Sequence, residues 1–499
     1  MSNWKWRLRA GAALGLATVM ALPAPAQIPT LGDSSDMTSG AERKLGESIA
    51  RELYRDPDYL DDPVLDEYVL GIWTRLLAAA RVRGELTSEL DERFAWQVLL
   101  GKDRVINAFA LPGGWLGLQL GLISVTASRD ELASVLAHEL SHVTQRHISR
   151  LMAQEQKQMP LVLAAMILGA LAAGKNSQAA SAMVSGGQAL AMQNQLNFSR
   201  DMEREADRVG YGVMTQAGFR PQGFVTMFEK LQQASRLNDN GSFPYLRTHP
   251  MTTERMAEMQ ARQQLAPRPA APAVDLVHAM MVGRARVLSN PGVDALRSYI
   301  AESEGLSLAP PVSMRQVTVL YAATLASANL REYPAAARLA ARLSALVSGD
   351  ANAAREAGVL AAEVALQAAD PARALALAPD AGRPELMLWS QARLLRRGGG
   401  AELAQRLQTW VAVHPRDAQA WQLLARAYAA EGQQLRAIRA EGEAQVAHLD
   451  YQAALDRFKA AQELARSGAG ARGDYIEASI IDTRARQVQS LLREQALER

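Results

Sequence analysis

Two histidines and a glutamate lie close enough along the chain to bind and use a metal ion. His138, Glu139 and His142 form the pattern H-E-x-x-H within a run of apolar residues that has helical periodicity. Residues four apart on a helix share a face, so both imidazoles can bind one ion while the glutamate holds a water molecule against it. The chemistry predicted is attack of a metal-activated water on a peptide bond.

The same pattern also arises by chance on exposed helices with ordinary surface histidines. Here apolar residues cover most of the predicted helix, which indicates a buried element whose polar side chains need partners, and a metal is one such partner. Ser128 and Glu131 match a capping box and mark the start of the helix. The apolar positions are Leu132, Ala133, Val135, Leu136, Leu140 and Val143.

A third metal ligand must be His, Glu or Asp, because the chain contains no cysteine. Glu203, Asp207 and Gly210 lie in a charged segment and would share one face of a helix, whereas Glu205 would point elsewhere. We expect Glu203 to bind the metal and Asp207 to fix the tautomer of a ligating histidine. Gly210 would let the two helices approach closely. The alternative is a solvated charged face with ordinary ion pairs.

Two further segments complete a resemblance to a known family. One is the sequence N-A-F-A-L-P-G-G at 107–114, and the other is T-H-P at 248–250. With H-E-x-x-H and the later E-x-x-A-D, they resemble the gluzincin zinc metallopeptidases of the HtpX-like and CAAX-protease-like group. The resemblance covers roughly residues 40–260.

The resemblance implies one Zn²⁺ per chain, with Glu139 as the general base that activates water. It also makes His249 of the T-H-P segment a candidate fourth ligand, which would displace the water and keep the enzyme latent. Alternatively, His249 is a hydrogen-bond donor to the transition state or an ordinary loop residue. The implied metal ligands are His138, His142 and Glu203.

A strand is predicted beside the metal over 104–110, ending at 111–114. An exposed strand edge can pair with an extended substrate backbone and select little for sequence. The simpler interpretation is an ordinary sheet edge. The residues assigned to this substrate edge are Asn107, Ala108, Phe109 and Ala110.

His147 lies nine residues after His138, which is too far along one continuous helix to bind the same ion. We expect it on the surface.

The N-terminus predicts a signal peptide over 1–26, with a basic start, a short apolar core and an A-x-A cleavage site at Ala24–Ala26. A periplasmic location without a stable membrane anchor follows. Cleavage would remove three basic residues and no acidic one, shifting the formal charge from +2 to −1. This balance gives no reason to expect nucleic-acid binding. A second apolar run at 161–173 is too short for a membrane span. The segment 161–190 is predicted to be a buried helix, a mobile lid over the active site, or a segment that dips into a membrane surface.

The fold predicted is mainly α, with an α+β zincin-type catalytic domain followed by a helical solenoid. The catalytic domain spans 27–264, with helices near 40–82 and strands at 93–99, 104–110 and 115–119. A Pro/Ala linker follows at 265–275, and a helical repeat domain spans 276–499.

The repeat domain is predicted from positions that recur at a spacing of 33. The sequence W-x-x-L-A-x-x-Y at 421–428 fits the tetratricopeptide pattern, whose helix pairs stack into a curved solenoid. An irregular helical bundle is the alternative. The recurring pairs are Leu388/Trp421, Ala392/Ala425, Leu395/Tyr428, Gly399/Gly432 and Ala404/Ala437.

Two functions fit these features. The resemblance implies a zinc endopeptidase that promotes outer-membrane protein assembly, degrades unfolded or misassembled barrels, and docks on the barrel-assembly machinery through its repeats. The alternative is a latent or non-proteolytic chaperone or scaffold.

Overall fold

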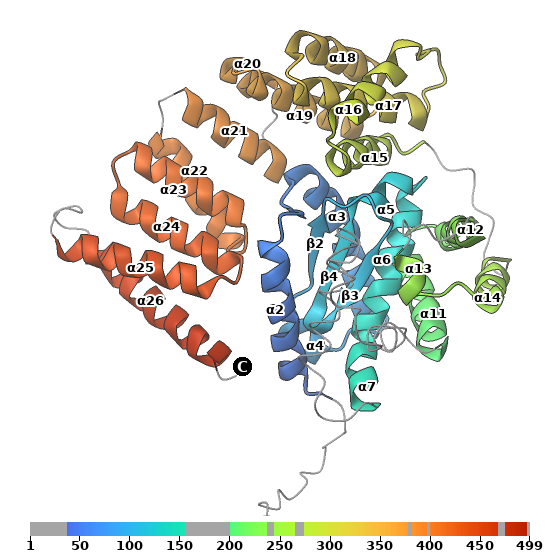
Figure 1. The fold of residues 1–499 in the computed structure, drawn as a ribbon, viewed down its shortest axis with the longest axis horizontal. Helices are drawn as coiled ribbons and strands as arrows, with labels where there is room; N and C mark the ends of the chain where they lie inside the picture. Colours follow the sequence, from blue (N-terminus) through green and yellow to red (C-terminus); the bar gives the residue numbers. More distant parts are fainter. Residues whose placement is uncertain are drawn as a thin grey trace, which may run out of the picture.

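The computed structural model describes residues 37–154, 200–236, 244–264, 274–377, 382–396, 400–467 and 475–496. It is a mainly α-helical structure with one small sheet, as predicted (Figure 1). The predicted signal peptide, the segment 161–190 and most of the Pro/Ala linker lie outside the described residues. Among the described helices, none combines the length and apolar character needed to cross a membrane.

The sheet has four strands in the order β1-β2-β4-β3. β2 and β4 are parallel, and the two outer pairs are antiparallel, so β3 is an edge strand among the described strands. The prediction for β4 is confirmed, whereas β2 and β3 each begin four residues later than expected. The bounds are β1 (Tyr59–Leu60), β2 (Gln97–Gly101), β3 (Ala108–Leu111) and β4 (Trp115–Gln119).

The late strand starts have local causes. Helix α4 (Ser88–Arg93) occupies the start of the first expected strand, and Trp96 then adopts a left-handed φ of 51°. Before β3, the Asp103 side chain accepts a hydrogen bond from the Val105 amide at 3.0 Å, which forms a turn in place of a strand.

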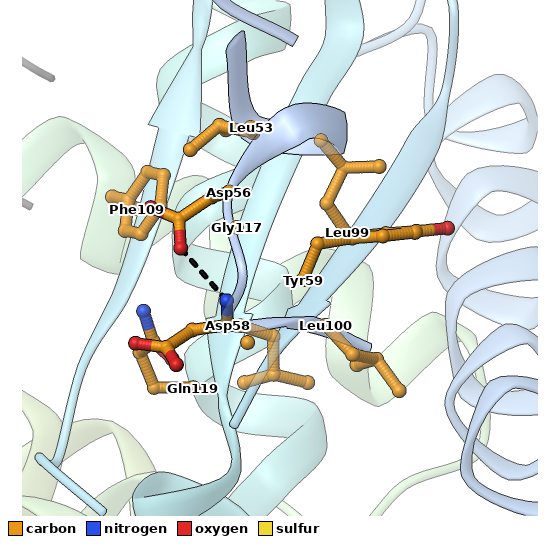
Figure 2. A pocket seen from close by; sticks show the side chains of 11 residues that line it. Leu53, Asp56, Asp58, Tyr59, Leu99, Leu100, Phe109, Gly117 and Gln119 are labelled. Atoms are coloured by element: carbon orange, nitrogen blue, oxygen red, sulfur yellow. Dashed lines mark hydrogen bonds between the residues drawn. The ribbon is translucent and has the colours of Figure 1, made fainter. Parts of the chain in front are cut away.

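The sheet lies between α2 (Ser39–Arg55) and α6 (Arg129–Thr144) (Figure 1). On the α2 side, Ile49, Leu99 and Trp115 belong to one buried apolar cluster. A small pocket lies where α2 ends, and Figure 2 shows Phe109, Gly117 and Asp56 around it. On the α6 side, the alanines of β3 join the main core.

Further helices surround α6. Helix α3 contacts both α6 and α11, and α12 packs on α6. Asp62 caps α3 by accepting from the Leu65 amide, and Pro63 follows at the first helical position. The bounds are α3 (Pro63–Val82), α5 (Leu120–Val125), α7 (His147–Gln154), α11 (Arg200–Gln216), α12 (Gln222–Arg236), α13 (Tyr245–Thr248) and α14 (Thr253–Gln264).

The described residues from 274 onward form helices joined by turns and short loops. Several tight turns between consecutive helices contain a residue with positive φ: Arg331, Ala369, Gly432 and Leu449. Such turns return the chain antiparallel to the preceding helix. The bounds are α15 (Leu276–Ser289), α16 (Val293–Glu304), α17 (Met314–Asn329), α18 (Tyr333–Leu346), α19 (Ala351–Gln367), α20 (Pro371–Leu377), α21 (Arg383–Leu395), α22 (Gly400–Val413), α23 (Ala418–Ala430), α24 (Gln434–Ala447), α25 (Tyr451–Arg466) and α26 (Tyr475–Ala496).

This helical region packs directly on the part of the chain that holds the sheet. Helix α15 lies against α5 and α3, and one cluster of buried apolar side chains includes described residues from Val64 of α3 to Leu360 of α19. At the other end, the ring of His448 stacks on Tyr54 of α2, with centroids 5.0 Å apart. The two parts therefore share buried surface on both sides of the sheet.

Three arginines of the helical region bind the acidic start of α3. Arg284 makes two hydrogen bonds to Asp62, of 2.6 and 2.8 Å, and is buried. Two further contacts follow the same pattern: Arg355 Nη1 lies 2.5 Å from Glu67 Oε1, and Arg383 Nη2 lies 2.7 Å from Asp61 Oδ1. The helical region is thus attached by charge as well as by apolar contact.

Replacing Arg284 with Met should destabilise the whole chain strongly. The change leaves the buried Asp62 carboxylate without its cationic partner, which costs on the order of 3–5 kcal/mol of unfolding free energy. Urea denaturation followed by circular dichroism measures the loss. Arg297→Met is the control, because Arg297 is exposed and lies 3.9 Å from Glu332, so its ion pair contributes at most about 1 kcal/mol. Equal losses for both variants would contradict the role given to Arg284.

Candidate metal centre

Helix α6 carries the H-E-x-x-H residues into the interior of the molecule. Ser128 caps it by accepting a hydrogen bond from the Glu131 amide at 3.2 Å, and the Glu131 side chain accepts from the Ala127 amide. His138, Glu139 and His142 are all buried. Polar groups in such a place require partners, since burying them unpaired is unfavourable.

The chain changes direction directly after α6. Gln145 ends the helix, and Arg146 takes a left-handed φ of 54°. His147 therefore begins a separate helix, α7, and its side chain turns back toward α6. The expectation of a surface position for His147 is wrong: the residue is fully buried, and its Nδ1 lies 2.9 Å from Nδ1 of His142.

Helix α11 brings Glu203 and Asp207 against α6. Gly210 makes the close approach possible, because a Cβ atom there would lie 3.0 Å from the Ala137 carbonyl oxygen. Glu203 and Asp207 are buried, whereas Glu205 faces α7. The shared face expected from the spacing therefore points at the histidines.

Four buried side chains offer ligand atoms that all lie within 4.8 Å of one another. The Nε2 atoms of His138 and His142 are 3.0 Å apart, and Glu203 Oε1 lies 3.4 Å from His142 Nε2. Among the described residues, Glu203 Oε1 has no hydrogen-bond donor. A buried carboxylate oxygen beside two imidazole nitrogens fits a metal ion with nitrogen and oxygen ligands, such as zinc. The group is His138, His142, Glu203 and His249.

Asp207 contacts the far nitrogen of one histidine. Its Oδ1 lies 2.9 Å from His138 Nδ1, which leaves His138 Nε2 facing the ligand cluster. Asp207 also receives two hydrogen bonds from Arg255, at 2.6 and 2.8 Å. A carboxylate in this position fixes the tautomer and orientation of the imidazole.

The chemistry of Arg255 was not apparent from the sequence. This buried arginine on α14 also places Nη1 2.8 Å from Glu203 Oε2 and donates to the Pro250 carbonyl oxygen. Its carboxylate partners lie about fifty residues away along the chain, so spacing gives no signal for them. Its position five residues after Pro250 is the only local clue.

Burial and neighbouring charges shift the pKa values of the carboxyl and imidazole groups in the site. Burial opposes ionisation of Asp207 and Glu203, but Arg255 and the histidines hold the pKa of both carboxyls below their usual values. Burial also disfavours the charged form of His138, yet the neighbouring carboxylates of Asp207 and Glu203 raise its pKa to about 9. Burial lowers the pKa of His142 well below its usual value. The two carboxylates thus favour a bound cation, which competes with the proton on His138.

Glu139 lies between the ligand cluster and the sheet edge. Its Oε2 accepts a hydrogen bond of 2.9 Å from the Ala110 amide of β3, and its Oε1 lies 3.5 Å from His249 Nε2. Burial raises the pKa of the Glu139 carboxyl. A carboxylate with a raised pKa is suited to accept and return a proton near neutral pH.

The four residues of the predicted substrate edge do not all have their side chains on the same face of the sheet. Ala108 and Ala110 belong to the core on the α6 side, whereas the Phe109 side chain lies in the pocket on the α2 side (Figure 2). The Asn107 carbonyl accepts from the Gln119 amide at 3.0 Å and so pairs toward β4. Of the four residues, Ala110 makes the direct contact with Glu139.

His249 reaches the cluster from the end of α13. Its backbone amide donates to the Tyr245 carbonyl, and its ring stacks on that of Tyr245, with centroids 4.5 Å apart. Thr248 Oγ1 lies 2.9 Å from His249 Nδ1, which leaves Nε2 directed at Glu139 and the cluster. The ring centroid is 5.3 Å from those of both His138 and His142.

Comparison with known proteins agrees with this geometry. Residues 78–263 match peptidase family M48. The chain is 33% identical over 283 residues to the beta-barrel assembly-enhancing protease of Yersinia pestis, covering 56% of this chain and 55% of that protein. It is 32% identical over 237 residues to the protein of that name in Escherichia coli K12, covering 47% of each.

A eukaryotic relative is more distant. The mitochondrial metalloendopeptidase OMA1 of Arabidopsis thaliana is 28% identical over 197 residues, covering 39% of this chain and 36% of that protein. The chain therefore spans about half the length of the bacterial relatives and less of the plant protein. The range that matches peptidase family M48, a family whose members use zinc, includes the whole buried ligand cluster.

Proposed function

We propose that the protein is a zinc-dependent endopeptidase of the periplasm that acts on unfolded or misassembled outer-membrane β-barrel proteins. The observation that carries the peptidase assignment is the buried cluster of two imidazoles and a carboxylate beside Glu139 and a strand edge. The periplasmic location is supported by the basic and apolar N-terminal sequence. The substrate class is supported by the names of the bacterial relatives.

His138, His142 and Glu203 would hold the zinc. Bound zinc would supply a Lewis acid that lowers the pKa of a water molecule and polarises a substrate carbonyl. Asp207 keeps Nε2 of His138 available by binding its Nδ1. Glu139 accepts the proton of the attacking water and then delivers it to the leaving amine.

The outer edge of β3 would bind the substrate backbone. Because the Ala110 amide points to Glu139, this edge lies beside the base that serves the reaction. An extended segment can add to a strand edge through main-chain hydrogen bonds, with little dependence on its side chains. Binding through the main chain suits unfolded substrates, because their extended backbone is free to pair with the strand edge.

His249 would hold the site latent. Together with His138, His142 and Glu203, it makes a set of four ligand atoms, the number that closes a tetrahedral zinc site to water. His249 lies on a short segment after α13, so a modest movement of that segment would open the fourth position. Latency would protect folded neighbours in the same compartment.

The helical region would recruit substrates or the barrel-assembly machinery. Residues 276–499 are proposed as a tetratricopeptide-type domain and residues 27–264 as the peptidase domain, joined by the linker 265–275. The tight turns and antiparallel helix contacts support stacked helix pairs. Stacked pairs create an extended surface suited to protein ligands.

A second candidate function is a chaperone or scaffold whose zinc site stays closed. The position of His249 favours it, because a four-ligand site resembles structural zinc sites. Glu139 favours the peptidase, because a structural site has no use for a buried base at this position. The two substitutions below distinguish these functions.

Glu139→Gln should abolish cleavage while zinc remains bound. The amide cannot accept a proton from water, whereas the three zinc ligands are unchanged. Cleavage of casein by the purified protein should fall by at least about 10²-fold, the low end for loss of a general base. Zinc content by elemental analysis should stay at one per chain. Equal cleavage by the variant would show that Glu139 is not the base.

His249→Ala should raise the rate of casein cleavage several-fold, because it opens the fourth ligand position to water. Zinc should be retained through His138, His142 and Glu203. Removal of zinc with a chelator should abolish the added activity, which excludes a contaminating metal-independent protease. Unchanged or lower cleavage with zinc retained would remove the latch and favour the alternative roles of His249.

A further inference from the structure

His147 is a buried histidine that the proposed mechanism does not use. It lies outside the group of ligand atoms found among the described residues, yet it touches that group through His142. The left-handed backbone at Arg146 is what turns it inward. A left-handed backbone conformation is unfavourable for a residue other than glycine or asparagine. The conformation of Arg146, which turns His147 inward, therefore needs a compensating contact.

The ring nitrogens of His147 face two partners. Nδ1 lies 2.9 Å from His142 Nδ1, and Nε2 lies 3.1 Å from Glu205 Oε2. Arg150 Nη1 donates to the same Glu205 oxygen at 2.7 Å. Residues from α6, α7 and α11 therefore form one continuous chain of polar contacts.

The direction of these hydrogen bonds follows from the chemistry of each group. Glu205 beside Arg150 is a carboxylate and can only accept, so His147 donates from Nε2. The neutral ring of a fully buried His147 then carries its lone pair on Nδ1. His142 must donate from its own Nδ1, which leaves the lone pair on His142 Nε2.

His142 Nε2 is the atom that faces His138 Nε2 and Glu203. We infer that His147 is a positioning residue for the metal centre: it accepts the hydrogen bond of His142 Nδ1 and so aims His142 Nε2 at the metal. Glu205 and Arg150 fix His147 in turn. This inference rests on the proposed zinc site.

The two ligating histidines are thus supported in different ways. His138 binds the carboxylate of Asp207 directly, whereas His142 reaches the carboxylate of Glu205 through a neutral imidazole. Hydrogen-bond acceptors behind ligating histidines typically contribute 10–100-fold to metal affinity. His147 supplies this contribution for His142.

Zinc affinity of the full-length protein, measured by competition with a chromophoric chelator, tests the inference. His147→Leu removes the acceptor and should weaken binding by about 10–100-fold. His147→Asn should restore affinity to within a few-fold of the native chain, since its Oδ1 can occupy the place of Nδ1. The visible spectrum of the cobalt-substituted protein should change in the Leu variant and recover in the Asn variant.

His278→Leu is the matched control. His278 is also fully buried, with Nδ1 2.6 Å from Tyr68 Oη and Nε2 3.2 Å from the Thr126 carbonyl, but it lies outside the ligand cluster. Its loss should affect stability without changing zinc affinity. If His147→Leu does not fold, Glu205→Gln provides the second variant, and its loss of charge should weaken zinc binding several-fold.

The outcomes separate this inference from the proposed function. Native affinity in His147→Leu, or in Glu205→Gln where the Leu variant does not fold, would overturn the positioning role and leave the zinc site intact. Binding by His147→Asn as weak as that of the Leu variant would also overturn it, because the acceptor would then not be the cause. Failure of the native chain to bind zinc would overturn the proposed function itself.

Discussion

The structure of the metal centre depends on pairing charges inside an apolar core. Glu203 and Asp207 on α11 are both buried and both contact Arg255 on α14, while Asp207 also binds His138 on α6. A buried charge without a partner is strongly destabilising, so these contacts fix the three helices relative to one another. The ligand atoms converge because the helices that carry them cannot rotate without exposing an unpaired charge to the core.

Much of the site could be predicted because its residues lie on regular helices. The period of the α-helix places His138 and His142 on one face of their helix. It places Glu203, Asp207 and Gly210 on one face of another helix, whatever the surrounding fold. The mainly α class and the helical C-terminal part were predicted correctly for the same reason, and the small sheet was also predicted. The repeat register remains a prediction.

The residues that escaped prediction depend on irregular backbone or distant contacts. His147 seemed too far along α6, and no glycine or proline marks the reversal at Arg146 that carries it inward. Arg255 meets its partners only after α14 has packed on α11. Strands β2 and β3 begin later than predicted because the short helix α4 and the turn at Asp103 include the residues before them. Local periodicity contains none of this information.

The apolar core that α3 shares with α15–α19 limits how this protein can be divided. Separating the peptidase part from α15–α21 would expose apolar side chains on both pieces. It would also leave without partners the carboxylates that Arg284, Arg355 and Arg383 neutralise. The C-terminal helices are therefore not an exchangeable attachment. A hybrid protein that carried other C-terminal helices would therefore need a redesigned apolar contact surface and new partners for the carboxylates at the start of α3.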